Sequence, residues 1–391
     1  MKANAVSKSN PWFFWFAVLT AFFTFLLLGL GGLVTSHEAG MSVPDWPNTY
    51  GNNMFLFPPA QWIGGIFYEH THRLLASLVG LMTTILAVWL WLRDSRPWMH
   101  WLGVAAFLLV VAQGVLGGLR VTLHMDSLGI YHATIAQLFF VLTCAIALFA
   151  SRWWNGLERR PPARREENSV DKHAVPEAGA PLRGLVLFTT ILIFVQLIIA
   201  AAMRHQHAGL AISDFPLAHG KLWPDTGAEA VARYNAQRVS INAENPITAF
   251  QIELQMAHRL AALAILILMV VCAWQVRGIG TPGTAPARMG NHVEPAETVL
   301  GAPVYQRLSL LWLGLTLVQI GLGAATIWTN KAADVATAHV LVGALILAVG
   351  ALWCAIAYRE TVAAVYDRRT EQRRLQSAAT IGAQPALTGN K

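Results

Sequence analysis

Residues 12–36 read WFFWFAVLTAFFTFLLLGLGGLVTS, an apolar run without a charged side chain. A helix of about 20 such residues is long enough to cross the hydrocarbon core of a bilayer. The run is too long for the apolar core of a signal peptide, and no small-residue cleavage site follows it. We therefore expect a membrane anchor that is retained.

Seven further apolar runs follow, at residues 71–92, 100–119, 128–150, 182–203, 252–276, 307–328 and 335–357. Each must satisfy its backbone hydrogen bonds inside the bilayer, so each is expected to be a helix. Only 13% of the 391 residues are charged, about half the usual share of a soluble domain. The sequence predicts an all-α polytopic membrane protein with eight transmembrane helices. It excludes a soluble enzyme, a disordered protein and a disulfide scaffold.

The 28 lysines and arginines are divided unevenly between the two sides of the membrane. Eight spans place both termini on one side, and that side carries 20 of these residues against eight on the other. Because cytoplasmic loops are enriched in Lys and Arg, both termini are expected in the cytoplasm, with the protein in the inner membrane. The same distribution explains the net charge of +7 without a nucleic-acid partner.

The second half of the chain repeats four motifs of the first half in the same order. The pairs are AGMSVPDWP (39–47) and AGLAISDFP (208–216), QxxLGG (113–118) and QxxLGA (319–324), HRLLA (72–76) and HRLAA (258–262), and His132 and His339. Each unit has four spans, so we expect two parallel four-helix bundles related by a pseudo-twofold axis along the membrane normal. The expected bundles are residues 1–160 and 182–358, joined by a cytoplasmic linker (161–181) and followed by a cytoplasmic tail (359–391).

Four of the 13 histidines occupy repeat-related positions, namely His72, His132, His258 and His339. An ionisable side chain in a membrane helix is costly and marks a functional site. Two imidazoles facing each other inside a bundle can bind one haem iron as axial ligands. Zinc would need further ligands, which neither an HExxH motif nor a cysteine cluster supplies. Both pairs lie toward the outer side, which argues against an electron wire across the membrane.

The two halves differ at one informative position. Glu69 stands three residues before His72, whereas Gln255 stands three residues before His258. Positions i and i+3 share a helix face, so Glu69 is expected beside the first haem pocket, where a carboxylate can accept a proton. Capping of the helix start is the alternative. We infer that the first half performs the chemistry and the second holds a redox or structural haem.

Three further expectations concern neighbouring residues. Arg73 and Arg259, directly after the histidines, either pair with haem propionates or extend toward the membrane surface. Asp45 and Asp214, in the repeated loops, are expected to form turns. His70 is expected to face away from the His72 site.

Together these motifs resemble the heme A synthase family over nearly all of both four-span units. The resemblance rests on GGLVT (31–35), the loop 39–47, Glu69-x-x-His72-Arg73, His132, GLAISDFP (209–216), His258-Arg259 and His339. It implies oxidation of the C8 methyl of haem O to a formyl group, giving haem A for cytochrome oxidase. Successive hydroxylations would lead to a hydrated aldehyde that loses water. The resemblance also implies that His72 and His132 flank the substrate haem, that Glu69 is essential, and that His258 and His339 bind a haem b cofactor.

One departure from the family is the absence of cysteine between His37 and Tyr68, where many bacterial relatives carry a pair. The implied partners are haem O, heme O synthase, cytochrome oxidase assembly factors and an electron-transfer partner, and an oligomer is compatible with the sequence. Two rival functions stay open: a dihaem b-type electron-transfer subunit, and a haem transporter or chaperone that would need the histidine pairs without Glu69.

Overall fold

The structure, a computed structural model, describes residues 10–158, 180–237, 246–277 and 301–382. Within these ranges it consists of helices and loops, without a β-strand. Eight of the described helices are long and apolar enough to cross a membrane, which confirms the predicted fold class. They are α1 (Pro11–Ser36), α2 (Gly65–Arg93), α3 (Pro97–Thr122), α4 (Leu128–Ala150), α6 (Ala180–His205), α8 (Ala249–Arg277), α9 (Gly301–Trp328) and α10 (Ala333–Gly382).

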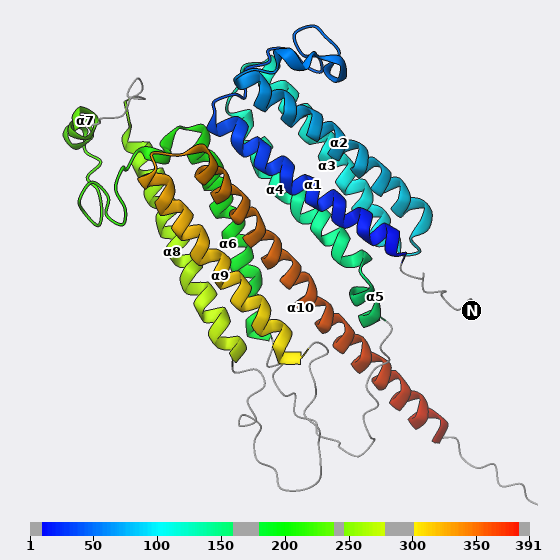
Figure 1. Cartoon of the computed structure of the whole chain (residues 1–391). Coiled ribbons are helices and arrows are strands. Elements are labelled where there is room, and N and C mark those ends of the chain that lie inside the picture. The colour runs from blue at the N-terminus through cyan, green and yellow to red at the C-terminus, as the bar shows by residue number, and fades with distance from the viewer. Residues whose placement is uncertain (1–9, 159–179, 238–245, 278–300, 383–391) are drawn as a thin grey trace, which may run out of the picture.

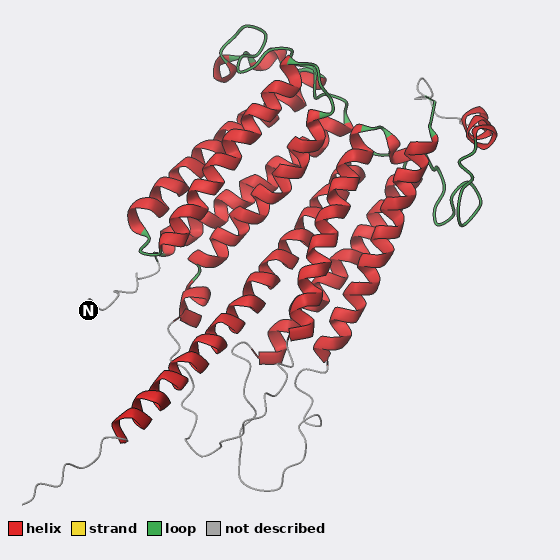
Figure 2. Ribbon diagram, turned by 180° about the vertical axis from the view of Figure 1, so that it is seen from behind, coloured by secondary structure: helices red, strands yellow, loops and turns green. Residues whose placement is uncertain are grey.

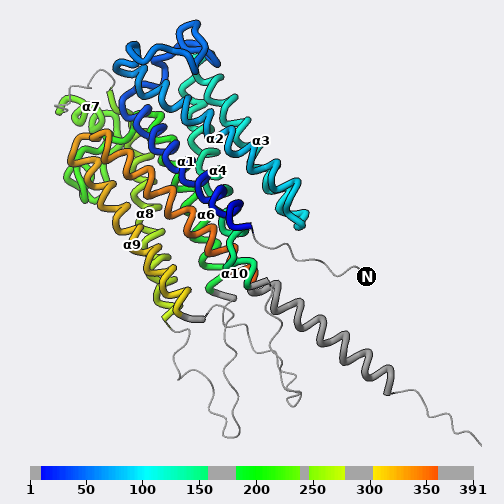
Figure 3. The backbone as a smooth tube through the Cα atoms, turned by 45° about the vertical axis from the view of Figure 1, so that its right-hand side comes forward, coloured from blue at the N-terminus to red at the C-terminus, as the bar shows by residue number. Residues whose placement is uncertain are grey.

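The long helices pack in two groups of four, visible side by side in Figure 1 and Figure 3. Helices α1 to α4 contact one another in a ring, which we call the N-terminal bundle, and α6, α8, α9 and α10 form a second ring, the C-terminal bundle. Helices α1 and α4 of the first ring contact α10 and α6 of the second, and we call this contact the seam. The pseudo-twofold axis between the bundles stays a prediction.

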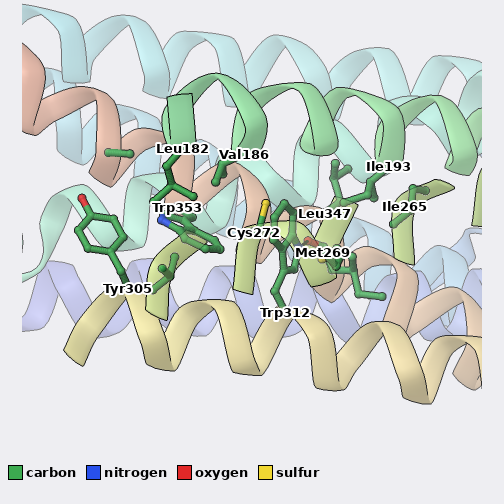
Figure 4. Packing of buried hydrophobic residues seen from close by; sticks show 13 residues of the cluster. Leu182, Val186, Ile193, Ile265, Met269, Cys272, Tyr305, Trp312, Leu347 and Trp353 are labelled. Carbon is green, nitrogen blue, oxygen red and sulfur yellow. Dashed lines mark hydrogen bonds between the residues drawn. The ribbon is translucent and has the colours of Figure 1, made fainter. Parts of the chain in front are cut away.

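Apolar side chains fill the interior of both bundles. In the C-terminal bundle the cluster drawn in Figure 4 centres on Trp312, Trp353 and Met269, and the two indole rings lie 5.5 Å apart, edge to face. Trp312 Nε1 donates a hydrogen bond to the carbonyl oxygen of Ile346 at 2.8 Å, so its only polar atom is satisfied in the apolar core. The N-terminal bundle has its own cluster around Leu86 and neighbouring residues.

The longest of the described loops gather at one end of both bundles (Figure 2, green). This end, which we call the loop end, carries residues 37–64, with η1 (Met54–Leu56) and η2 (Pro59–Gln61). It also carries residues 206–237, with η3 (Ala208–Leu210) and α7 (Ala228–Gln237), and residues 246–248. Helix α1 starts at the opposite end, where α5 (Arg152–Glu158) follows α4 and where α10 continues beyond the bundle.

Two helices extend beyond the predicted spans. Helix α2 begins at Gly65 rather than at residue 71, directly after Gly64, whose φ of +55° favours glycine. Glu69 and His72 therefore lie one and two turns inside the helix, and Glu69 does not cap its start. Helix α10 continues to Gly382 rather than ending near residue 357. The predicted linker falls almost entirely on residues 159–179, which lie outside the described residues, as does the end of the tail (383–391).

Candidate functional site

The four repeat-related histidines lie in four different helices, toward the loop end. His72 belongs to α2, His132 to α4, His258 to α8 and His339 to α10. The ring centres of His258 and His339 are 6.4 Å apart. Two imidazoles that share one metal ion, each bound at about 2 Å, have ring centres about 6 Å apart. His72 and His132 lie close enough to interact electrostatically. The structure thus brings the predicted residues together as one pair in each bundle.

Glycines of neighbouring helices make room for three of the four rings. A Cβ atom at Gly31 of α1 would lie 3.2 Å from Cε1 of His72. The corresponding distances are 3.4 Å from Gly117 to His132 and 3.2 Å from Gly323 to His339. The 3.2 Å contacts at Gly31 and Gly323 are tighter than ordinary van der Waals packing, so a side chain there would press on the imidazole ring. The 3.4 Å contact at Gly117 is at the limit of ordinary packing. The glycines of the repeated QxxLG motif therefore seat the histidines as well as pack the helices.

The donor set fits a haem with two axial ligands. The Nδ1 atoms of His72, His132 and His258 are buried without a hydrogen-bond partner among the described residues. A paired neutral imidazole is the common axial ligand of haem iron. The described residues contain no group of three or more His, Cys, Asp and Glu side chains placed to hold a metal ion. Each pair therefore suits a haem iron, whose other ligands come from the porphyrin, better than it suits zinc.

Glu69 is buried, with 4% of its surface exposed, and it holds the loop between α1 and α2. Its Oε2 atom accepts a hydrogen bond from the backbone N–H of Val43 at 2.8 Å. Gln255, 3% exposed, does the same in the C-terminal bundle, where its Oε1 atom accepts from the backbone N–H of Ile212 at 2.7 Å. Val43 and Ile212 are equivalent residues of the repeated loop motif. The two side chains share this anchoring contact and differ in charge.

Arg73 and Arg259 both bind loop carbonyl oxygens. Arg73 donates to the carbonyl oxygens of Asp45 at 2.7 Å and Asn48 at 2.9 Å. Arg259 donates to those of Asp214 and Leu217, each at 2.8 Å. The guanidinium groups are therefore directed into the loops, where they hold the same repeat positions. A contact of either residue with a haem propionate stays a prediction.

The two aspartates of the repeated loops form turns, as predicted. The Asp45 carboxylate accepts from the backbone N–H groups of Tyr50 at 2.8 Å and Gly51 at 2.7 Å. The Asp214 carboxylate makes the equivalent contacts with His219 and Gly220, at 2.6 and 2.8 Å. Burial raises the pKa of Asp45, but its backbone hydrogen bonds outweigh this effect and hold the pKa below its ordinary value.

His70 lies in α2 but packs against the loop between α1 and α2 and does not join the histidine pair. It is fully buried, its Nδ1 atom lies 3.2 Å from Oγ1 of Thr49, and its ring packs against Phe57 and Trp62. The sequence did not single out Arg204, in the last turn of α6, whose side chain reaches α1. It directly follows the apolar run 182–203 and stands among polar residues, so the sequence carries no distinct signal for it.

Comparisons with known proteins identify the family of the chain. A family model described as "Cytochrome oxidase assembly protein" matches residues 14–351. The chain is 27% identical to a heme A synthase of Shouchella clausii over 66% of this chain and 75% of the relative. It is 26% identical to a heme A synthase of Rhizorhabdus wittichii over 86% of this chain and 91% of the relative. It is also 23% identical to a heme A synthase of Shewanella oneidensis, over 83% and 90%.

The family match covers both bundles and all four histidines, and the aligned relatives carry one name. The chain belongs to the heme A synthase family of cytochrome oxidase assembly proteins.

Proposed function

We propose that this protein is a heme A synthase, which oxidises the C8 methyl group of haem O to a formyl group. The observation that carries the proposal is the difference between two otherwise equivalent loop anchors. Glu69 and Gln255 each accept the backbone N–H of the repeated loop, but only Glu69 can take up a proton. Family membership makes haem O the substrate and haem A the product.

The N-terminal bundle would hold the substrate. His72 of α2 and His132 of α4 both belong to this bundle, and Gly31 and Gly117 fit against their rings. Haem O would lie between the two imidazoles, with its iron bound by one or both and its position fixed by the rings. A fixed position brings the same methyl group toward the same protein groups at every turnover.

Glu69 would receive a proton during the oxidation. It lies one helical turn before His72 on α2, and Arg73 holds its Oε1 atom at 2.7 Å. Replacing methyl hydrogens by an oxygen removes both protons and electrons from the substrate. The carboxylate can accept a proton, while the electrons must pass to an acceptor outside the described residues.

The C-terminal bundle would hold haem b between His258 and His339, whose 6.4 Å separation suits two axial ligands. Haem b, when bound, supplies one-electron redox chemistry. Gln255 keeps the loop of this bundle in place without adding a proton acceptor. This division assigns oxidation to one bundle and a cofactor to the other.

We also propose an inner-membrane location with both termini in the cytoplasm and the loop end toward the periplasm. The excess of Lys and Arg on the side of the termini supports this orientation. Haem O would then enter between helices from the outer leaflet, with heme O synthase, cytochrome oxidase assembly factors and an electron-transfer protein as partners.

Pigment analysis tests the proposed function. The protein would be expressed with a source of haem O in cells that make no haem A, and the extracted haems would be identified by mass. Haem A or its hydroxylated precursor is expected, and a His72→Ala/His132→Ala variant should make neither. If only haem b accompanied the protein in cells that contain haem O, a dihaem electron carrier or a haem carrier would be favoured instead.

A further inference from the structure

Arg204 extends from one bundle into the other. It lies near the end of α6, in the C-terminal bundle, and its Nη2 atom donates to two acceptors on α1 of the N-terminal bundle. These are the carbonyl oxygen of Gly32 and the hydroxyl of Ser36, the latter at 2.6 Å. A cationic side chain therefore crosses the seam at the loop end.

The guanidinium group has hydrogen-bond donors left over. Both of its hydrogen bonds leave from Nη2, and its Nε atom is buried without a partner among the described residues. No carboxylate of these residues lies within ion-pair distance of Arg204, in contrast to Arg73, which is paired with Glu69. A largely buried charge without a counterion is unfavourable in a membrane protein. The side chain is thus placed to receive an anion.

The surroundings of Arg204 add positive charge. Burial lowers the pKa of Lys331, and the charge of Arg204 lowers it further, while Glu38 offsets this only in part. The seam at the loop end is therefore a site where a carboxylate or a phosphate would be stabilised.

The position of Arg204 indicates which anion it receives. Its charge acts on His339. Its acceptor Gly32 also lies against α10, where a Cβ atom at Gly32 would be 3.0 Å from Cγ2 of Thr337, two residues before His339. The hydroxyl of Thr337 is buried without a partner among the described residues. Within the described part of the chain, the Nε atom of Arg204 and the hydroxyl of Thr337 are thus unpaired donors at the seam, the latter two residues before His339 along α10.

Arg259, the other arginine near this pair, is engaged elsewhere. It donates to Asp214 and Leu217, and its guanidinium carbon lies 5.5 Å from the centre of the Phe215 ring. Its cation is therefore largely used to hold the loop. Arg259 uses both of its terminal nitrogens in these hydrogen bonds, whereas Arg204, at the seam, uses Nη2 alone.

We propose that Arg204 receives a propionate carboxylate of the porphyrin held by His258 and His339. This inference rests on the proposed function, since it presumes a haem in the C-terminal bundle. The guanidinium makes a charge-assisted hydrogen bond with the carboxylate and keeps its two contacts with α1. A phosphate of an anionic lipid has the same chemistry and is the competing source of an anion.

The test compares haem b with haem b dimethyl ester, in which both propionates are blocked. The full chain would be prepared without haem and with His72→Ala, so that binding reports on the C-terminal pair, and titrated by its Soret absorbance. The chain with Arg204 should bind the free acid about tenfold more tightly than the ester. Arg204→Gln should remove this preference. Arg233→Gln, which changes an exposed arginine of α7, should leave it intact.

Two further variants separate the ligand contact from the structural role of Arg204. Ser36→Ala removes an acceptor on α1 and keeps the cation, so the preference should persist. Arg204→Lys should lower the preference several-fold, because lysine keeps the charge and loses the fork of donors. If Arg204→Gln does not accumulate, an unchanged preference in Arg204→Lys overturns the proposal, as does equal binding of acid and ester by the chain that retains Arg204.

The lipid source is tested in nanodiscs made with phosphatidylcholine alone or with added phosphatidylglycerol. Thermal stabilisation by phosphatidylglycerol that Arg204→Gln abolishes, with the haem preference unchanged, would assign Arg204 to lipid and overturn the proposal. The failure of the proposed function would look different. The cells would contain no haem A, although their protein still bound haem b more tightly than its dimethyl ester.

Discussion

Oε1 of Glu69 accepts a hydrogen bond from Nη2 of Arg73 at 2.7 Å, one turn along α2. The same guanidinium nitrogen donates to the carbonyl oxygen of Val43 at 3.0 Å. In the C-terminal bundle, the amide of Gln255 makes the equivalent contact, with the carbonyl oxygen of Ile212 at 3.3 Å. In the N-terminal bundle, a carboxylate and its arginine hold the loop backbone at Val43. In the C-terminal bundle, a single neutral amide holds the equivalent backbone at Ile212.

Glu69→Gln should retain the loop and the bound haem and abolish haem A formation. Gln255 shows that a glutamine fits the equivalent anchor and accepts the same backbone N–H. Loss of a general base lowers rates by about 10²–10⁴-fold. Haem content by pyridine haemochrome and products by extraction would check this. Haem A at the level of the unsubstituted protein would rule out a role of Glu69 in proton transfer.

Arg73→Met should destabilise the protein by about 3 kcal/mol, because it leaves the buried carboxylate of Glu69 without its cation. The double variant Glu69→Gln/Arg73→Met should lose less than the sum of the two single variants, since the neutral amide needs no cation. Thermal unfolding in detergent measures both. Arg93→Met, at the exposed far end of α2, is the matched control and should change little. Additive effects of the two substitutions would contradict the coupling.

Gly31→Ala should weaken haem binding in the N-terminal bundle. The new Cβ atom would lie 3.2 Å from Cε1 of His72 and would push the ring out of place. Gly80→Ala, on α2, is the control, because a Cβ atom there meets nothing within 4 Å. It should be neutral or stabilising by up to about 1 kcal/mol. The two variants would be compared by haem-to-protein ratio, and equal ratios would show that Gly31 does not seat the ring.

Acid should destabilise the first repeated loop through Asp45. Its pKa is lower in the folded protein than its ordinary value, so its ionised form stabilises the fold above the ordinary pKa. This stabilisation is lost as the pH falls from the ordinary value through the lower folded one. Asp45→Asn should be less stable near neutral pH, with a smaller loss on acidification. Unfolding midpoints between neutral pH and about pH 3 would test this, and parallel curves for both proteins would contradict it.

The eight helices, the turns at Asp45 and Asp214, and the choice of the four histidines could be predicted from the chain alone. An uncharged run such as residues 12–36 has few alternatives to a spanning helix in a bilayer. Each aspartate binds backbone N–H groups only five and six residues further along the chain. Repetition then identified His72, His132, His258 and His339 without any knowledge of their surroundings.

Only the tertiary structure decided what surrounds these residues. The periodicity of α2 places Glu69 and Arg73 on one face, but it does not reveal that they grip Val43 in the preceding loop. Nor does it reveal that Arg204 reaches α1 across the seam, 172 residues away in the chain. A helical pattern specifies which side chains share a face, whereas the residues opposite that face depend on how distant helices pack.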